Sequence, residues 1–178
     1  MKTRTARTGD FPAICELIEK YAGQGLLLPR AAADVRAQLD RFLVVTEAAN
    51  NLGSRAERLL GCVSLEPYGN DLAEVRSLAV IPEARGRGAG GELIEAALET
   101  ARGRGIARIF AVTHAPGLFE RHGFDVAPRQ AVPEKIERDC HTCSHKRDCE
   151  LVAVVAVVCA DRDLLHVLSS PFKVGAAL

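Results

Sequence analysis

Residues 74–104 constrain the fold more than any other stretch of this 178-residue chain. A largely apolar, β-favouring run over 75–81 stops at Pro82, which has no N–H to continue a ladder. From Glu92 onward, leucine, isoleucine and alanine recur at helical spacing, as on one face of an amphipathic helix. Between the two lies the turn R-G-R-G-A-G-G at 85–91. This order of strand, glycine turn and helix predicts an α/β domain built around the connection.

The glycine turn has the properties of an anion-binding loop. Its glycines let the backbone approach a ligand closely and adopt positive φ angles at little cost. Unpaired N–H groups and the positive end of the helix dipole favour a diphosphate there, and two arginines add charge-assisted donors. A plain structural connection is the alternative, because short glycine motifs are common. The predicted ligand-binding residues of the turn are Arg85, Gly86, Arg87, Gly88, Ala89, Gly90 and Gly91.

The register of the glycines decides between known phosphate-binding motifs. Neither G-x-G-x-x-G after a strand nor G-x-x-x-x-G-K-S/T fits the turn. Arg85, Gly88 and Gly90 instead fill R-x-x-G-x-G, after a strand that ends in Val-x-Pro. This pattern resembles the acetyl-CoA signature of the GNAT superfamily of N-acetyltransferases. The segment 118–124 also resembles that superfamily's short helix and its Gly-Phe turn into a strand.

The resemblance implies a fold class and a cosubstrate. The class is α/β (α+β), with a mixed, mostly antiparallel sheet of about seven strands, flanked by helices and splayed at the acetyl-CoA site. It also implies that the N–H of Leu78 polarises the thioester carbonyl, while Ala79 and Val80 pair with the pantetheine arm. Phe119 takes the place where many relatives carry a tyrosine that protonates the leaving thiolate. A phenyl ring touches the coenzyme but has no proton to give, which leaves the general acid open.

The remaining elements follow from periodicity and turn residues. We expect strands over 2–7, 42–47, 59–66, 108–113 and 151–159, and further helices over 11–23 and 31–41. A turn-rich stretch at 50–55 predicts a hairpin, so that the second to fourth strands form an antiparallel meander. The strand 108–113 should run parallel to the central one, because a helix connects them.

The loop 24–30 predicts an acceptor site. Its three leucines lie between a glycine and a proline, and they either pack onto the domain or form a lid. Arg30 would grip a carboxylate through its bidentate fork, together with Arg76. With the signature above, the Leu-Leu-x-Pro-Arg loop resembles the amino-acid N-acetyltransferases of N-acetylglutamate synthase type, which act in arginine biosynthesis. That resemblance implies acetyl transfer to the amine of a small acceptor, an amino acid such as L-glutamate.

Glu74 is the candidate general base. Period-two geometry places it on the same strand face as Arg76 and Leu78. Glu74 also matches the position where some GNAT enzymes carry a catalytic glutamate, which acts directly or through a water. The alternative is a salt bridge to Arg76, or a strand-end charge in water.

The segment 132–150 contains Cys140, Cys143, His145 and Cys149, which could supply the four ligands of a closed zinc site. Structural zinc ligands usually come as two separated pairs, whereas these crowd into one short loop. We therefore predict no metal here and prefer free or redox-sensitive thiols.

The composition argues against two classes of binding partner, nucleic acid and membranes. Lys plus Arg and Asp plus Glu both number 23, so no overall field recruits nucleic acid or an anionic membrane. The N-terminus lacks a signal-peptide pattern, and the longest apolar run is too short to span a bilayer, which predicts a cytoplasmic protein. We expect one N-acetyltransferase domain over 1–178 with a Cys-rich insert at 132–150, and a homodimer is left open. A non-catalytic acetyl-CoA sensor, or acetylation of another amine or a protein N-terminus, is the alternative.

Overall fold

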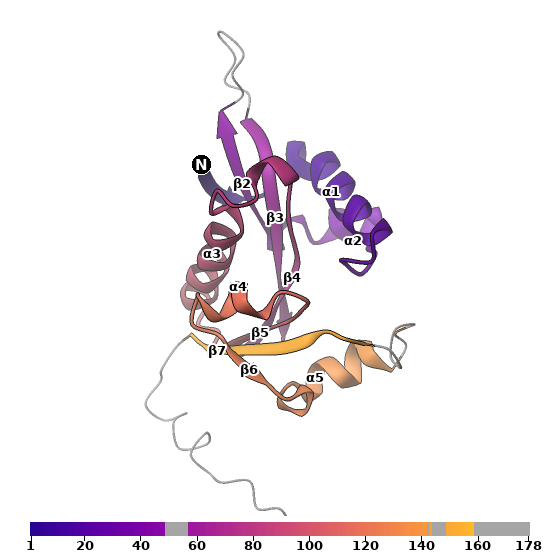
Figure 1. Cartoon of the computed structure of the whole chain (residues 1–178), viewed down its shortest axis with the longest axis vertical. Helices are drawn as coiled ribbons and strands as arrows, with labels where there is room; N and C mark the ends of the chain where they lie inside the picture. Colours follow the sequence, from indigo (N-terminus) through magenta and orange to yellow (C-terminus); the bar gives the residue numbers. More distant parts are fainter. Residues whose placement is uncertain (49–56, 142, 144–148, 159–178) are drawn as a thin grey trace, which may run out of the picture.

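The computed structural model describes residues 1–48, 57–141, 143 and 149–158 (Figure 1). Its centre is a seven-stranded sheet of order β1-β2-β3-β4-β5-β7-β6, in which β4 and β5 run parallel and all other neighbours antiparallel. The strands are β1 (Lys2–Thr5), β2 (Phe42–Ala48), β3 (Glu57–Tyr68), β4 (Leu72–Val80), β5 (Arg108–Thr113), β6 (Asp125–Ala127) and β7 (Val152–Val157).

Helices cover both faces of the sheet, as Figure 1 shows, with α3 on one side and α1 and α2 on the other. The α-helices are α1 (Phe11–Gly23), α2 (Ala32–Ala37), α3 (Ala89–Gly103), α4 (Pro116–Glu120) and α5 (Pro133–Lys135), which a π-helical turn continues over Ile136–Cys140. Short 3-10 turns occupy Thr8–Asp10, Leu39–Arg41, Pro82–Ala84 and Arg129–Ala131.

The apolar core has three clusters: a large one under α3, a second one under α1, and a small third one made of Tyr68, Leu72, Phe110, Val132 and Ala153. The larger cluster joins α3 to the inner sides of β2 to β5 and β7, with Leu93, Ile94 and Ile109 fully buried. The second packs α1 against the opposite face through Ile14, Ile18 and their neighbours. This division follows the helical spacing of apolar residues in α1 and α3, each of which presents a single apolar stripe.

The parallel strands β4 and β5 pair over only a short stretch. Only Leu72, Ala73 and Glu74 of β4 pair with β5, although β4 continues to Val80 and β5 to Thr113. Beyond Glu74 the two strands separate, and β5 keeps its other neighbour, β7, along its whole length. The edge of β4 from Val75 onward is therefore open toward β5.

A β-bulge also interrupts β4. The register with β3 pairs Cys62 with Ala79 and Ser64 with Arg76, so Ser77 and Leu78 together oppose Val63. Ser77 has φ 52°, the one positive φ among the non-glycine residues that the structure describes. The bulge re-aims the backbone at Leu78.

The expected fold class is confirmed, with differences at element ends. α3 begins at Ala89, three residues earlier than its apolar periodicity indicated, because Gly90 and Gly91 join the first helical turn. β3 runs on through Pro67, which pairs with Ala73 despite its missing N–H. The expected helix over 31–41 is α2 followed by a 3-10 turn. The expected hairpin turn at 50–55 lies outside the described residues.

Within the described part of the chain, no helix combines the length and the apolar character needed to cross a bilayer.

Gly61 gives a test of how tightly α3 packs on the sheet. A Cβ at this position would lie 2.7 Å from the carbonyl oxygen of Ala79 and 3.1 Å from Leu93. We expect Gly61→Ala to lower the free energy of unfolding by about 1–3 kcal/mol, measured by urea denaturation. Gly103→Ala is the matched control, since its Cβ would meet nothing within 4 Å. A Gly61→Ala protein as stable as the Gly103→Ala protein would contradict this packing.

Candidate active site

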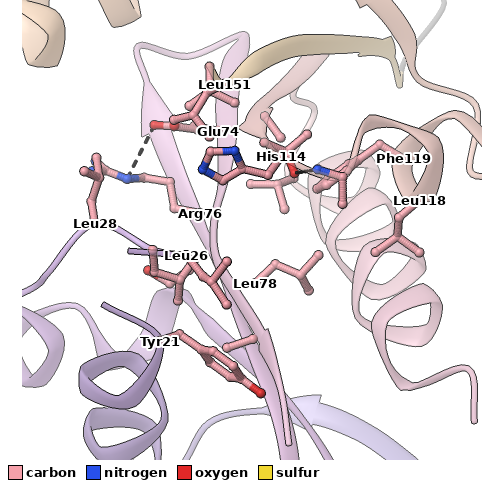
Figure 2. A pocket seen from close by; sticks show the side chains of 18 of the residues that line it. Tyr21, Leu26, Leu28, Glu74, Arg76, Leu78, His114, Leu118, Phe119 and Leu151 are labelled. Atoms are coloured by element: carbon pink, nitrogen blue, oxygen red, sulfur yellow. Dashed lines mark hydrogen bonds and ion pairs between the residues drawn. The ribbon is translucent and has the colours of Figure 1, made fainter. Parts of the chain in front are cut away.

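A cavity of about 910 Å³ opens where β4 and β5 separate. Figure 2 shows Leu26 and Leu28 on one side of it, Leu118 and Phe119 on the other, and Leu78 between them. The cavity extends from the glycine turn at one end to Glu74 and the Cys-rich segment at the other. Its size lies in the usual range for small-molecule sites.

The glycine turn lines one end of the cavity. Gly86 and Gly88 have φ angles of 73° and 87°, and an added Cβ at either would meet no atom within 4 Å. The backbone conformation, rather than crowding, therefore requires glycine at these two positions. The first intrahelical bond of α3 runs from Glu92 N to Gly88 O at 3.0 Å, so the preceding amides are available to an anion. These residues suit the diphosphate of acetyl-CoA.

The two arginines of the turn differ. Arg85 lines the cavity, and its guanidinium donates to the Tyr21 hydroxyl at 2.7 Å. Arg87 does not line the cavity, and its guanidinium bonds instead to Glu47 of β2 at 2.7 Å. A direct role for Arg87 toward the coenzyme stays a prediction.

The open edge of β4 forms the middle of the cavity. Ile81 N donates to Leu60 O at 2.8 Å, so the preceding residue, Val80, directs its N–H and C=O away from β3 and toward the gap. The Val80 carbonyl accepts a hydrogen bond of 2.6 Å from Tyr21. Together with the bulged Leu78, this edge can pair with an extended ligand.

The wall opposite β4 comes from α4 and the end of β5. Phe119 is buried and packs edge-on against Phe124, with 5.2 Å between the ring centroids. His114 also lines the cavity and is labelled in Figure 2.

Residues 25–30 of the loop line the side of the cavity opposite α4. Leu26 and Leu28 are exposed, at 50% and 37%, whereas Leu27 packs against the α1 cluster. Only one of the three leucines packs onto the domain, and the other two are placed as a lid would be.

Arg30 is anchored in the cavity wall by neutral groups. Its guanidinium donates to Ser64 at 3.4 Å and to Gln38, and it lies over the Phe42 ring at 5.3 Å. Burial, and then the nearby charge of Arg76, lower the pKa of Arg30. Among the described residues, no carboxylate oxygen lies within ion-pair distance of it. This guanidinium is suited to bind a carboxylate supplied by a ligand.

Glu74 is buried and enclosed by charged groups. Lys135 Nζ lies 2.9 Å from Oε1 and 3.0 Å from Oε2, and the Tyr68 hydroxyl donates to Oε2 at 2.9 Å. Arg76 is more distant, with Nε 3.5 Å from Oε2 (Figure 2). The salt bridge to Arg76, predicted from the sequence as the alternative to a general base, is present, but Lys135 is the closer partner.

Asp139 completes this cluster. Its Oδ2 lies 2.6 Å from Lys135 Nζ, 3.4 Å from Arg76 and 2.9 Å from the Tyr68 hydroxyl. Burial alone would raise the pKa of Asp139, but the hydrogen bonds from Lys135 and Tyr68 and the charge of Arg76 lower it to about 2. Burial and the adjacent carboxylates raise the pKa of Tyr68 well above 10. Burial alone would lower the pKa of Arg76, but the nearby charges of Glu74 and Asp139 outweigh it, so the pKa of Arg76 is raised.

Sequence reasoning missed Tyr68, Lys135 and Asp139 as site residues. The one local signal was the i,i+4 spacing of Lys135 and Asp139, which suits an ion pair on a helix. Lys135 follows Glu74 by 61 positions in the chain. The contact between them depends on how α5 docks beside β4.

Cys140, Cys143 and Cys149 all line the cavity, and all three are free thiols. Arg129 bonds to the sulfur of Cys149. Among the described residues, no group of three His, Cys, Asp or Glu side chains is arranged to hold a metal ion. His145 lies outside those residues.

Comparisons with known proteins cover most of the chain. The acetyltransferase (GNAT) family profile matches residues 12–124. An uncharacterised N-acetyltransferase of Chlorobaculum tepidum is 34% identical over 152 residues, which cover 85% of this chain and 93% of that protein. An amino-acid acetyltransferase of Mycobacterium tuberculosis is 35% identical over 121 residues, covering 68% of this chain and 66% of that protein.

Among solved structures, N-acetylglutamate synthase from Neisseria gonorrhoeae, complexed with coenzyme A and N-acetyl-glutamate, aligns with a TM-score of 0.75 at 28% identity. The alignment covers 89% of this chain but 35% of that protein. This chain likewise spans 30% of the length of the Neisseria meningitidis amino-acid acetyltransferase that it matches.

Asp139 predicts a pH-dependent contribution to stability. Its folded pKa of about 2 lies below the ordinary 3.8, so its contribution is fully present above pH 4 and is lost as the pH falls toward 2. We expect Asp139→Asn to cost at most about 2 kcal/mol of unfolding free energy at pH 7, with the difference from wild type shrinking below pH 4. Urea denaturation across this range measures it, with the exposed Asp125→Asn as control. A difference that stays constant down to pH 2 would contradict the ion pairing.

Proposed function

Because the chain belongs to the GNAT family of acetyltransferases, we propose that it acetylates the α-amino group of a small acidic amino acid, with L-glutamate as first candidate. The chain is an acetyl-CoA-dependent N-acetyltransferase of GNAT type; the acceptor is the proposal. A place in arginine biosynthesis and a homodimer stay predictions.

The choice of acceptor rests on the environment of Arg30. This residue lines the acceptor side of the cavity, oriented by Gln38, Ser64 and the Phe42 ring. A half-buried guanidinium without a carboxylate partner is costly, and an acceptor that brings a carboxylate removes that cost. The amino-acid acetyltransferases among the relatives, and the N-acetyl-glutamate bound to the Neisseria gonorrhoeae enzyme, agree with such an acceptor.

The coenzyme end of the mechanism uses the backbone. The glycine turn and the first amides of α3 hold the diphosphate, with Arg85 beside them. The pantetheine arm lies along the open edge of β4, where Val80 offers an N–H. The N–H of Leu78, set by the bulge, donates to the thioester oxygen and stabilises the oxyanion that forms there.

The acceptor end uses Arg30 for the carboxylate and Glu74 for the amine. The acceptor arrives as an ammonium ion, and Glu74 takes one proton, directly or through a water. The free amine attacks the thioester carbon, a C–N bond forms, and the tetrahedral intermediate collapses as the C–S bond breaks. The second amine proton is lost with the collapse, and the thiolate of CoA takes up one proton. Phe119 has none to give, so water or another side chain supplies it.

The substrate class is tested by thiol release from acetyl-CoA over the amino acids and simple amines. We expect glutamate or another acidic amino acid to give the highest kcat/KM. Arg30→Ala should raise the KM for that acceptor by about 100-fold, as expected for a lost charge-assisted contact, with the KM for acetyl-CoA nearly unchanged. Arg30→Lys should recover only part of the affinity, because an ammonium lacks the bidentate fork.

Arg36→Ala is the matched control for Arg30. It removes an arginine that stacks on Phe11 at 4.3 Å and does not line the cavity. Equal KM values for wild type and Arg30→Ala, or a preference for acceptors without a carboxylate, would exclude the proposed acceptor class.

The role of Glu74 is tested by Glu74→Gln, which keeps the shape of the side chain and removes its basicity. We expect kcat to fall by about 10²–10⁴-fold, the usual contribution of a general base. The rate of Glu74→Gln should also recover at high pH, where the acceptor amine is already neutral. Steady-state kinetics from pH 6 to pH 10 measure both effects. A Glu74→Gln enzyme with wild-type kcat at pH 7 would leave Glu74 as a structural ion only.

A further inference from the structure

Glu74 needs a path by which its proton leaves. Its side chain is 2% exposed, so a proton taken from the acceptor does not pass directly to bulk water. Per turnover, an acceptor ammonium and acetyl-CoA give the N-acetyl product, CoA thiol and one proton, and that proton has to reach solvent. This requirement rests on the proposed function, in which Glu74 is the base.

The hydroxyl of Tyr68 connects Glu74 to a second carboxylate. It lies 2.9 Å from Glu74 Oε2 and 2.9 Å from Asp139 Oδ2. A phenol has one proton, so it donates to one of these oxygens at a time and can accept from the other. The Asp139 side chain is 25% exposed, and it is the solvent end of this chain of three groups.

Cations hold the two carboxylates at these distances. Lys135 Nζ contacts both Glu74 and Asp139, and Arg76 lies 3.5 Å and 3.4 Å from them. Arg138 lies over the Tyr68 ring at 3.5 Å. The charged groups that face Tyr68 are thus Glu74 and Arg76 from β4, Lys135 from α5, and Arg138 and Asp139 from the π-helical turn.

We propose that Glu74, Tyr68 and Asp139 form a proton relay from the acceptor site to solvent, with Lys135 as a positioning residue. Protonated Glu74 gives its proton to the Tyr68 oxygen while the Tyr68 O–H proton passes to Asp139. Asp139 then releases a proton to water, and rotation of the Tyr68 hydroxyl restores the starting arrangement. One proton enters from the acceptor and one leaves at Asp139, with no net change in the three side chains.

A purely structural ion cluster is the competing explanation, since buried charges commonly pair for stability alone. The two explanations differ in what the Tyr68 hydroxyl does. In a structural cluster it contributes a hydrogen bond, and its loss lowers stability. In a relay it carries a proton in every turnover, and its loss slows proton release.

Tyr68→Phe separates these cases, because it removes the hydroxyl and keeps the ring packed edge-on against Phe110 at 5.3 Å. With acetyl-CoA and glutamate as substrates, we expect kcat to fall at least about tenfold, with both KM values nearly unchanged. The rate of Tyr68→Phe should rise with buffer concentration, as imidazole replaces the missing proton carrier. Its solvent deuterium isotope effect should exceed that of the wild type.

Tyr21→Phe is the matched control, because it removes the other tyrosine hydroxyl of the chain, which bonds to Val80 at the coenzyme end. It should change the KM for acetyl-CoA without making the rate depend on imidazole. Asp139→Asn tests the same path from its solvent end. It is the second test of the relay if Tyr68→Phe does not fold. It too should gain a dependence on imidazole.

The outcomes separate the relay from the function on which it rests. Wild-type kcat and no imidazole effect in Tyr68→Phe or Asp139→Asn, alongside a slow Glu74→Gln, would overturn the relay and leave the base in place. A fully active Glu74→Gln would remove the base and the relay together. An enzyme that releases no thiol with any amino acid would overturn the proposed function, and with it the relay.

Discussion

The parting of β4 from β5 is the constraint on which the rest of the structure depends. The parallel strands β4 and β5 pair over only three residues. Beyond Glu74, β3 continues to pair with one edge of β4, whereas the backbone groups on the other edge have no partner in β5. Such groups require water, a side chain or an extended ligand. The Tyr21 hydroxyl satisfies one of them, the carbonyl of Val80. The gap also forms the cavity, so one feature of the sheet provides both an unpaired strand edge and the space beside it.

The last paired residue of β4 is also the buried acid, and the two facts are linked. At Glu74 the sheet is still closed, which excludes water, while the next residues already border the cavity. A single carboxylate at that point would be strongly destabilising. Lys135, Arg76 and Arg138 face Glu74 and Asp139, so both carboxylates are paired with cations. The insert after β6 therefore contributes to the wall of the cavity, since α5 supplies Lys135.

The sequence predicted the features that local pattern determines. The glycine turn, the ends of β5 and the parallel direction of β4 and β5 follow from residues that lie close together in the chain. The ion cluster could not be predicted, because Tyr68, Glu74 and Lys135 meet only through the docking of α5 beside the sheet. For the same reason the ion pair of Arg87 with Glu47 on β2, a strand distant in sequence, could not be predicted. The direction of a long side chain depends on tertiary partners that periodicity does not report.

In the proposed function, one cavity treats its two substrates differently because of how its charges are arranged. Backbone amides of the glycine turn hold the diphosphate of acetyl-CoA, and they favour an anion without committing a side-chain charge. At the acceptor side, Arg76 already faces Glu74 and Asp139, whereas Arg30 is bonded to neutral groups. The neighbouring positive charge of Arg76 also lowers the pKa of Arg30, so an incoming carboxylate relieves a repulsion as well as gaining hydrogen bonds. In the proposed function, an acceptor without a carboxylate gains neither effect, so the environment of Arg30 favours an anionic acceptor.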